Sequence, residues 1–229
     1  MALNKQTFKI RATTAVVFAA VMLVGLFWNK WAFLLLFSVI MIGCLVEYAR
    51  LVNKFNRGLI FLAVFYIIMP LLMMMDLGVD GTLFASGNKR LAGNFTALFP
   101  SAIIFSIWIN DTMAYIVGSL IGKTPFSKIS PNKTWEGTGG GAILCVVVIA
   151  IMGSVIPAAK HIAFQHWIVI AAICAIFGTM GDLLESKLKR LANVKDSGHF
   201  MPGHGGFLDR FDSLLLATPF VWLYLELFL

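Results

Sequence analysis

Long runs of apolar residues, separated by short polar segments, dominate this chain of 229 residues. A helix needs about 20 apolar residues to cross a bilayer, where no water satisfies an exposed backbone. Hydrophobic residues make up 59% of the chain and charged residues 13%, about half the usual charged share of a soluble domain. The sequence therefore predicts an all-α bundle of about seven spanning helices, near residues 13–28, 31–49, 59–75, 100–121, 140–157, 165–184 and 212–228.

The basic side chains indicate how these spans are oriented. If the N-terminus is cytoplasmic, fourteen Lys and Arg residues lie on the cytoplasmic side and only four on the other side. Cytoplasmic loops of membrane proteins carry such an excess of basic residues. The net charge of +7 is therefore largely a topology signal and does not indicate nucleic-acid binding. The four residues expected outside are Lys30, Lys89, Arg90 and Lys160.

Neither a cleaved leader nor a disulfide framework is indicated. The first apolar segment follows a basic start, but no small-residue cleavage site precedes the next segment, so we interpret it as a retained span. The three cysteines lie inside apolar segments, which is typical of small buried hydrophobes and does not match a disulfide or zinc pattern. They are Cys44, Cys145 and Cys174.

The N-terminal transmembrane region, residues 1–95, shows little chemistry. The segment Glu47–Arg50 ends the second span, and we interpret it as an interfacial anchor because aromatic and basic residues favour that depth. A polar loop is expected over residues 76–94, where several glycines argue against regular structure. We expect the catalytic region to be residues 96–229.

An acid in the fourth span points to function. Asp111 is predicted to lie near the middle of a membrane helix, where a carboxylate is costly and by default marks a functional site. The alternative is a structural ion pair or a protonated, hydrogen-bonded acid. After the next loop, Gly139–Gly141 opens the fifth span, where glycines let helix backbones approach closely.

The longest strongly polar run, residues 186–213, lies between two pairs of acids. Asp182 and Glu185 end the sixth span, and Asp209 and Asp212 begin the seventh; each pair is three residues apart and so shares a helix face. If the loop folds back, four carboxylates can meet at the cytoplasmic surface. Mg²⁺ uses one or two carboxylates together with substrate phosphate oxygens. For each acid alone, the alternative is a salt bridge to a neighbouring Lys or Arg.

Three elements occur in order in the C-terminal half. The pattern D-T-x-A-Y-x-x-G stands at Asp111–Gly118, and S-P-x-K-T-W-E-G stands at Ser130–Gly137. The third element is the polar run, which contains three patterns. They are S-x-x-K-R at residues 186–190, K-D-S-G at 195–198 and P-G-H-G-G-x-x-D-R-x-D at 202–212. Together they resemble the signature of the phosphatidate cytidylyltransferases (CDP-diacylglycerol synthases). A match of this length is far more specific than a lone glycine motif.

The resemblance implies that CTP and phosphatidate react to give CDP-diacylglycerol and pyrophosphate, with Mg²⁺ as cofactor and a second, monovalent cation left open. It implies CTP, phosphatidate and membrane lipid as partners, without nucleic acid, and a homodimer as the alternative to a single copy. We expect a multi-pass protein of the bacterial plasma membrane with a cytoplasmic active site. The alternatives are another CTP-dependent enzyme, such as a CDP-archaeol synthase or polyprenol kinase, and a transporter with Asp111 in its pathway.

The motif positions also imply site residues. The expected metal ligands are Asp182, Asp209 and Asp212, and the expected catalytic residues are Asp182, Asp209, Lys195 and Asp111, the last supporting the site through a basic partner or ion. The glycines near His204 could bring backbone N–H groups to an anion or permit a tight turn. The expected substrate-binding residues are Ser130, Lys133, Thr134, Glu136, Lys189, Arg190, Ser197, His204, Gly205, Gly206 and Arg210.

Overall fold

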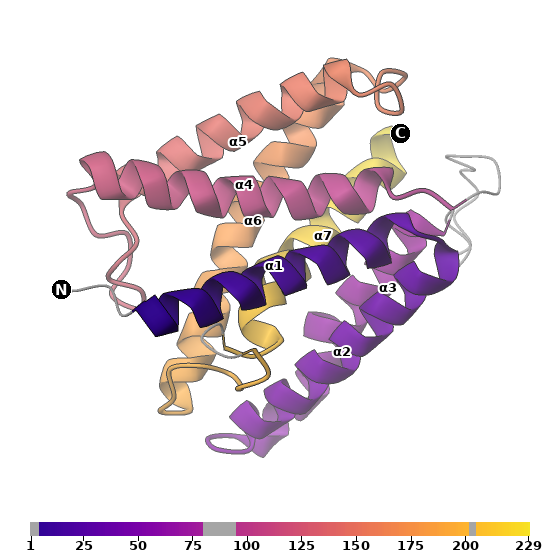
Figure 1. The fold of residues 1–229 in the computed structure, drawn as a ribbon. Coiled ribbons are helices and arrows are strands. Elements are labelled where there is room, and N and C mark those ends of the chain that lie inside the picture. The colour runs from indigo at the N-terminus through magenta and orange to yellow at the C-terminus, as the bar shows by residue number, and fades with distance from the viewer. Residues whose placement is uncertain (1–4, 80–94, 202–204) are drawn as a thin grey trace.

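The computed structural model describes residues 5–79, 95–201 and 205–229, with side chains from Ala12 onward (Figure 1). These residues form α-helices and two isolated β-bridges, without a β-strand. Before α3, the chain passes through a 3₁₀ helix at Arg57–Leu62 and a π-helix at Val64–Ile68. The helices are α1 (Lys5–Phe27), α2 (Lys30–Val52), α3 (Met69–Gly78), α4 (Leu98–Ile121), α5 (Trp135–Val155), α6 (Phe164–Leu191) and α7 (Leu208–Phe228).

These helical segments coincide with the seven predicted spans. Six of them are long and apolar enough to cross a membrane, counting Arg57–Gly78 as one segment. The first, α1, contributes the shorter apolar stretch Ala12–Phe27 within the described side chains. The prediction of an all-α, polytopic membrane bundle is confirmed.

Local sequence signals explain where several helices begin. The side chain of Asn29 accepts a hydrogen bond from Ala32 N at 2.9 Å and caps α2, and Thr134 caps α5 through Gly137 N at 3.1 Å. Pro70 lies in the first turn of α3, directly after the π-helix, where its missing N–H interrupts no regular α-helical ladder. Caps and proline therefore set the element boundaries within the apolar runs.

The helices of the C-terminal region pack closely on one another. The helix α4 lies beside α5 and crosses α6, and α6 packs against α7 (Figure 1). A Cβ atom added at Gly141 would lie 2.7 Å from Ala114 Cβ, so only glycine permits this approach of α5 to α4. The close-packing role expected for the glycines that open the fifth span is therefore confirmed for Gly140 and Gly141, whereas a Cβ atom added at Gly139 would have no atom within 4 Å.

The N-terminal helices join the same core through α7, which contacts both α2 and α3. Asp76 was expected in a polar loop, but it is fully buried in α3 and accepts a hydrogen bond from Trp222 Nε1 at 2.9 Å. Burying this carboxylate requires such a donor, which α7 supplies. The rest of that predicted loop, residues 80–94, lies outside the described residues.

Large apolar side chains cover the outside of the bundle, as expected for a surface in contact with lipid. Trp28 and Trp31 flank the α1–α2 turn and are 74% and 76% exposed, which suits an aromatic belt at one membrane interface. At the other end, the α4–α5 and α6–α7 loops and the C-terminal end of α2 gather at the left and lower left of Figure 1. The polar motifs therefore lie together at one end of the bundle.

Candidate active site

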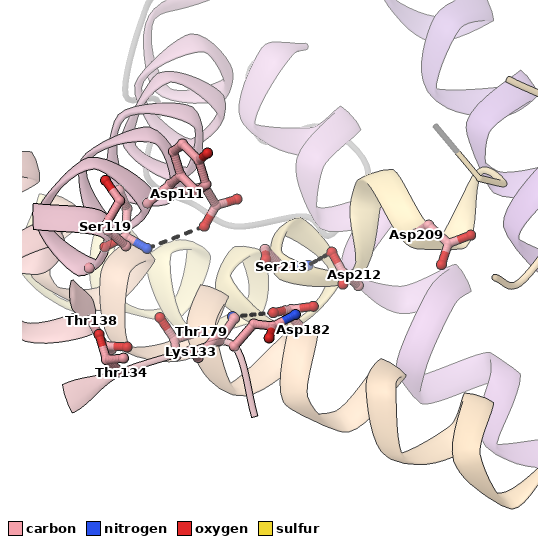
Figure 2. A pocket seen from close by; sticks show the side chains of 15 residues that line it. Asp111, Ser119, Lys133, Thr134, Thr138, Thr179, Asp182, Asp209, Asp212 and Ser213 are labelled. Atoms are coloured by element: carbon pink, nitrogen blue, oxygen red, sulfur yellow. Dashed lines mark hydrogen bonds and ion pairs between the residues drawn. The ribbon is translucent and has the colours of Figure 1, made fainter. Parts of the chain in front are cut away.

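A cavity of about 430 Å³ lies between the end of α4, the start of α5 and the facing parts of α6 and α7. Four of its acids are Asp111, Asp182, Asp209 and Asp212, and Lys133 lies beside Asp182 (Figure 2). Hydroxyl and amide groups complete the polar wall. They belong to Asn110, Ser119, Asn132, Thr134, Thr138, Thr179 and Ser213. The cavity thus joins residues of all three sequence elements.

Three carboxylates form a tight group, here called the carboxylate cluster: Asp182, Glu185 and Asp212. One ligand oxygen from each lies within 4.8 Å of the others, and Glu185 and Asp212 are buried. The i, i+3 spacing on α6 presents the first two acids together, and α7 supplies the third. Buried like charges require a compensating cation, and oxygen ligands suit a hard divalent ion. The donor set therefore fits Mg²⁺.

Two lysines compensate part of this negative charge. Lys133 Nζ forms an ion pair with Asp182. Lys189 Nζ lies 2.5 Å from Glu185 Oε2 and 2.7 Å from Asp209 Oδ1, so it joins the carboxylate cluster to the start of α7. The structure places Lys189 among the site's own acids, and its predicted role in substrate binding stays a prediction.

Lys133 is held at the cavity by the loop between α4 and α5. Glu136, in the first turn of α5, accepts hydrogen bonds from Thr124 Oγ1 at 2.8 Å and Thr124 N at 3.1 Å, which ties the two ends of the loop together. The Ser130 carbonyl accepts from Lys133 N at 3.1 Å in a turn. Thr134 lines the cavity and caps α5, whereas Glu136 acts on the loop from outside the cavity wall.

Asp209 lies in a different environment from the carboxylate cluster, although it also lines the cavity. Its Oδ2 accepts hydrogen bonds from Ser197 N and Gly206 N, each at 2.8 Å, and lies 2.8 Å from Ser197 Oγ. Its Oδ1 accepts a hydrogen bond from Lys189 Nζ. These donors occupy the oxygens that a metal ion would use. The role of Asp209 as a metal ligand stays a prediction, and the geometry favours Glu185 as the third acid beside Asp182 and Asp212.

The glycine-rich segment surrounds carboxylates of the protein itself. Gly205 has φ of 81°, a left-handed conformation that favours glycine, and Gly206 N donates to Asp209. A Cβ atom added at Gly206 would lie 2.5 Å from Glu47 Cδ, so a larger residue would displace that side chain. His204, predicted to contact substrate, lies outside the described residues.

Glu47 is the functional candidate that sequence reasoning missed. It lies on α2, is 5% exposed, and its Oε2 accepts hydrogen bonds from Ser197 Oγ at 2.7 Å and Leu208 N at 2.9 Å. We had interpreted it as part of an interfacial anchor. The signal that singled out Asp111, an acid within an apolar span, also applies to Glu47.

The remaining predicted residues lie around these two acidic centres. Asp111 is exposed and lines the acidic cavity, and Asn110 Nδ2 lies 3.4 Å from its Oδ1. Arg190 Nη1 donates to Val194 O at 3.3 Å, and Arg210 is exposed at the start of α7. These positions leave the predicted roles of Asp111, Arg190 and Arg210 untested.

Lys195 lines a second cavity, of about 680 Å³, at the C-terminal end of α2. Arg50 and Lys54 lie in the same cavity wall, together with Ser197 and His199. Ser197 contributes to this wall while it contacts Asp209, so the two cavities lie on either side of the same loop. The basic cavity suits an anionic group, whereas the acidic cavity suits a cation.

Comparison with known proteins shows which sequences this chain resembles. A family model described as "Cytidylyltransferase family" matches residues 54–228. A phosphatidate cytidylyltransferase of Rickettsia typhi is 32% identical over 226 residues, which cover 96% of this chain and 92% of the relative. This alignment runs through both the N-terminal and the C-terminal regions.

Two other relatives match mainly the part that contains the motifs. A phosphatidate cytidylyltransferase of Bacillus subtilis is 44% identical over 134 residues, and one of Staphylococcus saprophyticus is 47% identical over 114 residues. The matches cover 58% and 49% of this chain, but only 48% and 43% of those longer relatives. Because the family model covers more than half of the chain and the Rickettsia relative nearly all of it, the chain belongs to the cytidylyltransferase family.

Proposed function

We propose that this protein transfers a cytidylyl group from CTP to phosphatidate, giving CDP-diacylglycerol and pyrophosphate. The observation that carries the proposal is the carboxylate cluster, two of whose acids, Asp182 and Asp212, line a cavity with Lys133 at one end of a membrane helix bundle. Such a site can bring a water-soluble triphosphate to a phosphate group on a lipid. The names of the bacterial relatives support the same substrates.

The carboxylate cluster would hold Mg²⁺ through Asp182, Glu185 and Asp212. Three acids whose oxygens approach within 4.8 Å, two of them buried, are more stable with a divalent ion between them than without one. When bound, the ion polarises the α-phosphate of CTP and neutralises charge on the departing pyrophosphate. A second, monovalent cation stays an open part of the proposal, and Asp111 is the cavity acid outside the carboxylate cluster that could contact it.

The reaction needs positioning more than proton transfer. A phosphate oxygen of phosphatidate, already anionic at neutral pH, forms a bond to the α-phosphorus, and the bond from that phosphorus to the oxygen bridging toward the β-phosphate breaks. Lys133 and the hydroxyl of Thr134, which accepts from Gly137 N and keeps its own proton, are placed to donate to phosphoryl oxygens as charge develops. The basic cavity around Lys195 attracts the anionic substrates to the same face.

The assay uses purified protein, phosphatidate, Mg²⁺ and CTP labelled at either the α- or the γ-phosphorus. Cytidylyl transfer moves only the α-label into lipid and releases pyrophosphate. A polyprenol-kinase activity would instead move the γ-label. A lipid panel that includes archaeal ether lipid tests the CDP-archaeol alternative, and ion flux in liposomes without nucleotide would support a transporter. Absence of α-label in phosphatidate-derived lipid would contradict the proposal.

We place the protein in the bacterial plasma membrane with the active site facing the cytoplasm, on the basis of the charge asymmetry. Single cysteines in a background lacking Cys44, Cys145 and Cys174 test this orientation. Lys128→Cys lies in the exposed α4–α5 loop, and Lys160→Cys lies in the exposed α5–α6 turn as its matched control. An impermeant thiol reagent should label only Lys160→Cys in intact cells. Labelling of Lys128→Cys in intact cells would show that the protein has the opposite orientation.

A further inference from the structure

The N-terminal region reaches the candidate active site through a single buried carboxylate. Glu47 and Leu208 are 161 positions apart in sequence, yet Leu208 N donates to Glu47 Oε2 at 2.9 Å. The same oxygen accepts from Ser197 Oγ at 2.7 Å. Glu47 therefore contacts the connection between α6 and α7 at two places, at Ser197 within it and at the first residue of α7.

A continuous series of short contacts leads from Glu47 to the carboxylate cluster. The Ser197 hydroxyl lies between Glu47 Oε2 and Asp209 Oδ2, at 2.7 Å and 2.8 Å. Asp209 then accepts from Lys189, and Lys189 pairs with Glu185 of the cluster. We call Glu47, Ser197, Asp209 and Lys189 the loop node. Each member is at most partly exposed, so water competes little for these contacts.

Glycines make room for the Glu47 side chain within the loop. A Cβ atom added at Gly198 would lie 2.6 Å from Glu47 Cδ, and one added at Gly206 would lie 2.5 Å from the same atom. The loop backbone thus closes around this carboxylate on two sides. An interfacial anchor would need none of these contacts, because its head group would remain in water.

We infer that Glu47 is a positioning residue of the active site: it fixes the α6–α7 loop and thereby the placement of Asp209, Lys189 and Glu185. This inference rests on the proposed function, because the positioned groups matter only if the cavity is the reaction site. Glu47 does not line the acidic cavity, and it acts through Ser197 and the start of α7. Misplacement of catalytic groups by about 1 Å can lower a rate by about 100-fold.

The experiment compares Glu47→Ala and Glu47→Gln with the parent protein in detergent. Glu47→Ala should lower kcat by about 100-fold per folded molecule, with smaller changes in KM. Hydrogen exchange should accelerate at the amides of Ser197, Gly206 and Leu208 and stay unchanged on α4 and α5. Glu47→Gln retains an oxygen that can accept both donors, so it should recover kcat to within about tenfold of the parent.

Asp76→Ala is the matched control. Asp76 is another buried N-terminal acid that accepts a hydrogen bond from α7, but its partner is Trp222, thirteen positions beyond the cavity-lining Asp209. This variant should lose thermal stability while kcat per folded molecule and exchange at the α6–α7 loop stay at parent values. If Glu47→Ala behaves like this control, with kcat within about threefold of the parent, Glu47 has a structural role and the inference is wrong.

The inference can still be tested if Glu47→Ala does not fold or if the parent protein is inactive. If Glu47→Ala does not fold, Ser197→Ala takes its place, because it removes the hydroxyl between Glu47 and Asp209. A fall in kcat of about tenfold or more with faster exchange at Gly206 and Leu208 supports the inference, and parent values of both contradict it. If the parent protein shows no cytidylyl transfer, the proposed function fails, whereas the exchange rates at Ser197, Gly206 and Leu208 still report whether Glu47 holds the loop.

Discussion

The two acidic centres of this protein are adjacent but differ in how their charge is balanced. In the carboxylate cluster, Asp182 pairs with Lys133 at the cavity wall, and the oxygens of the three acids face one another. In the loop node, one oxygen of Asp209 accepts from two backbone N–H groups, one oxygen of Glu47 accepts from a third, and the Ser197 hydroxyl lies between the two acids. Acids surrounded by protein donors hold structure in place, whereas acids that face one another attract a ligand. The predictions below test this difference.

The largest effect is expected at the carboxylate cluster. Asp182→Asn should lower kcat by at least about 100-fold, the scale of losing a principal electrostatic stabiliser. The unfolding temperature should not fall, because the change removes one of three neighbouring negative charges. Steady-state kinetics and thermal unfolding of the same sample measure both quantities. Near-normal turnover in a folded Asp182→Asn protein would show that Asp182 is not a ligand of the proposed metal ion.

Asp209→Asn should lower both activity and stability. The asparagine NH₂ group would face either Lys189 or the donors Ser197 N and Gly206 N, and no orientation of the amide provides two acceptors. We expect a loss of about 1–3 kcal/mol in the free energy of unfolding, with a fall in kcat of about 100-fold. Chemical denaturation and kinetics check this. Lost turnover at unchanged stability would instead place Asp209 with the metal ligands, as the sequence predicted.

Asp111→Asn should have an intermediate effect. Asp111 lines the same cavity as Asp182 and Asp212 but lies outside both centres, so removing its charge should lower kcat by about tenfold. CTP binding should be retained, because the shape and hydrogen-bonding capacity of the side chain are preserved. The measurement is kcat together with a CTP binding isotherm. Full activity would identify Asp111 as a structural residue.

The smallest effect is expected at Arg190, which is exposed and donates to Val194 O at the end of α6. Exposed charge pairs contribute about 0.2–1 kcal/mol, so Arg190→Gln should raise the KM for phosphatidate about threefold at unchanged kcat. Raising the ionic strength should reduce the difference between the variant and the parent. A large fall in kcat would show that Arg190 contacts the reacting groups.

Much of the fold followed from the sequence because hydrocarbon restricts the choices. Apolar runs long enough to span a bilayer must be helical, and the seven predicted segments coincide with the helices. The predicted loop that began at residue 76 started too early, since Asp76 is buried in α3. The polarity of its side chain suggested a loop, but its hydrogen bond to Trp222 keeps it in the helix bundle.

The acids of the candidate site were partly predictable. Helical spacing correctly placed Asp182 and Glu185 on one face of α6, and the motifs indicated the start of α7. Spacing treated Asp209 and Asp212 alike, because both lie near the N-terminus of the same helix. The structure separates them: Asp212 is buried beside α6, and Asp209 turns toward the α6–α7 loop.

By itself, the sequence determined the helical membrane bundle, the polar end of that bundle and the acids available there, because these depend on segment length, helical period and local charge. Only the tertiary structure decided which acids face one another and which are occupied by backbone donors. Glu47 shows why. Its partners Ser197 and Leu208 lie more than a hundred residues away, so nothing near Glu47 in the chain records that the α6–α7 loop closes around its carboxylate.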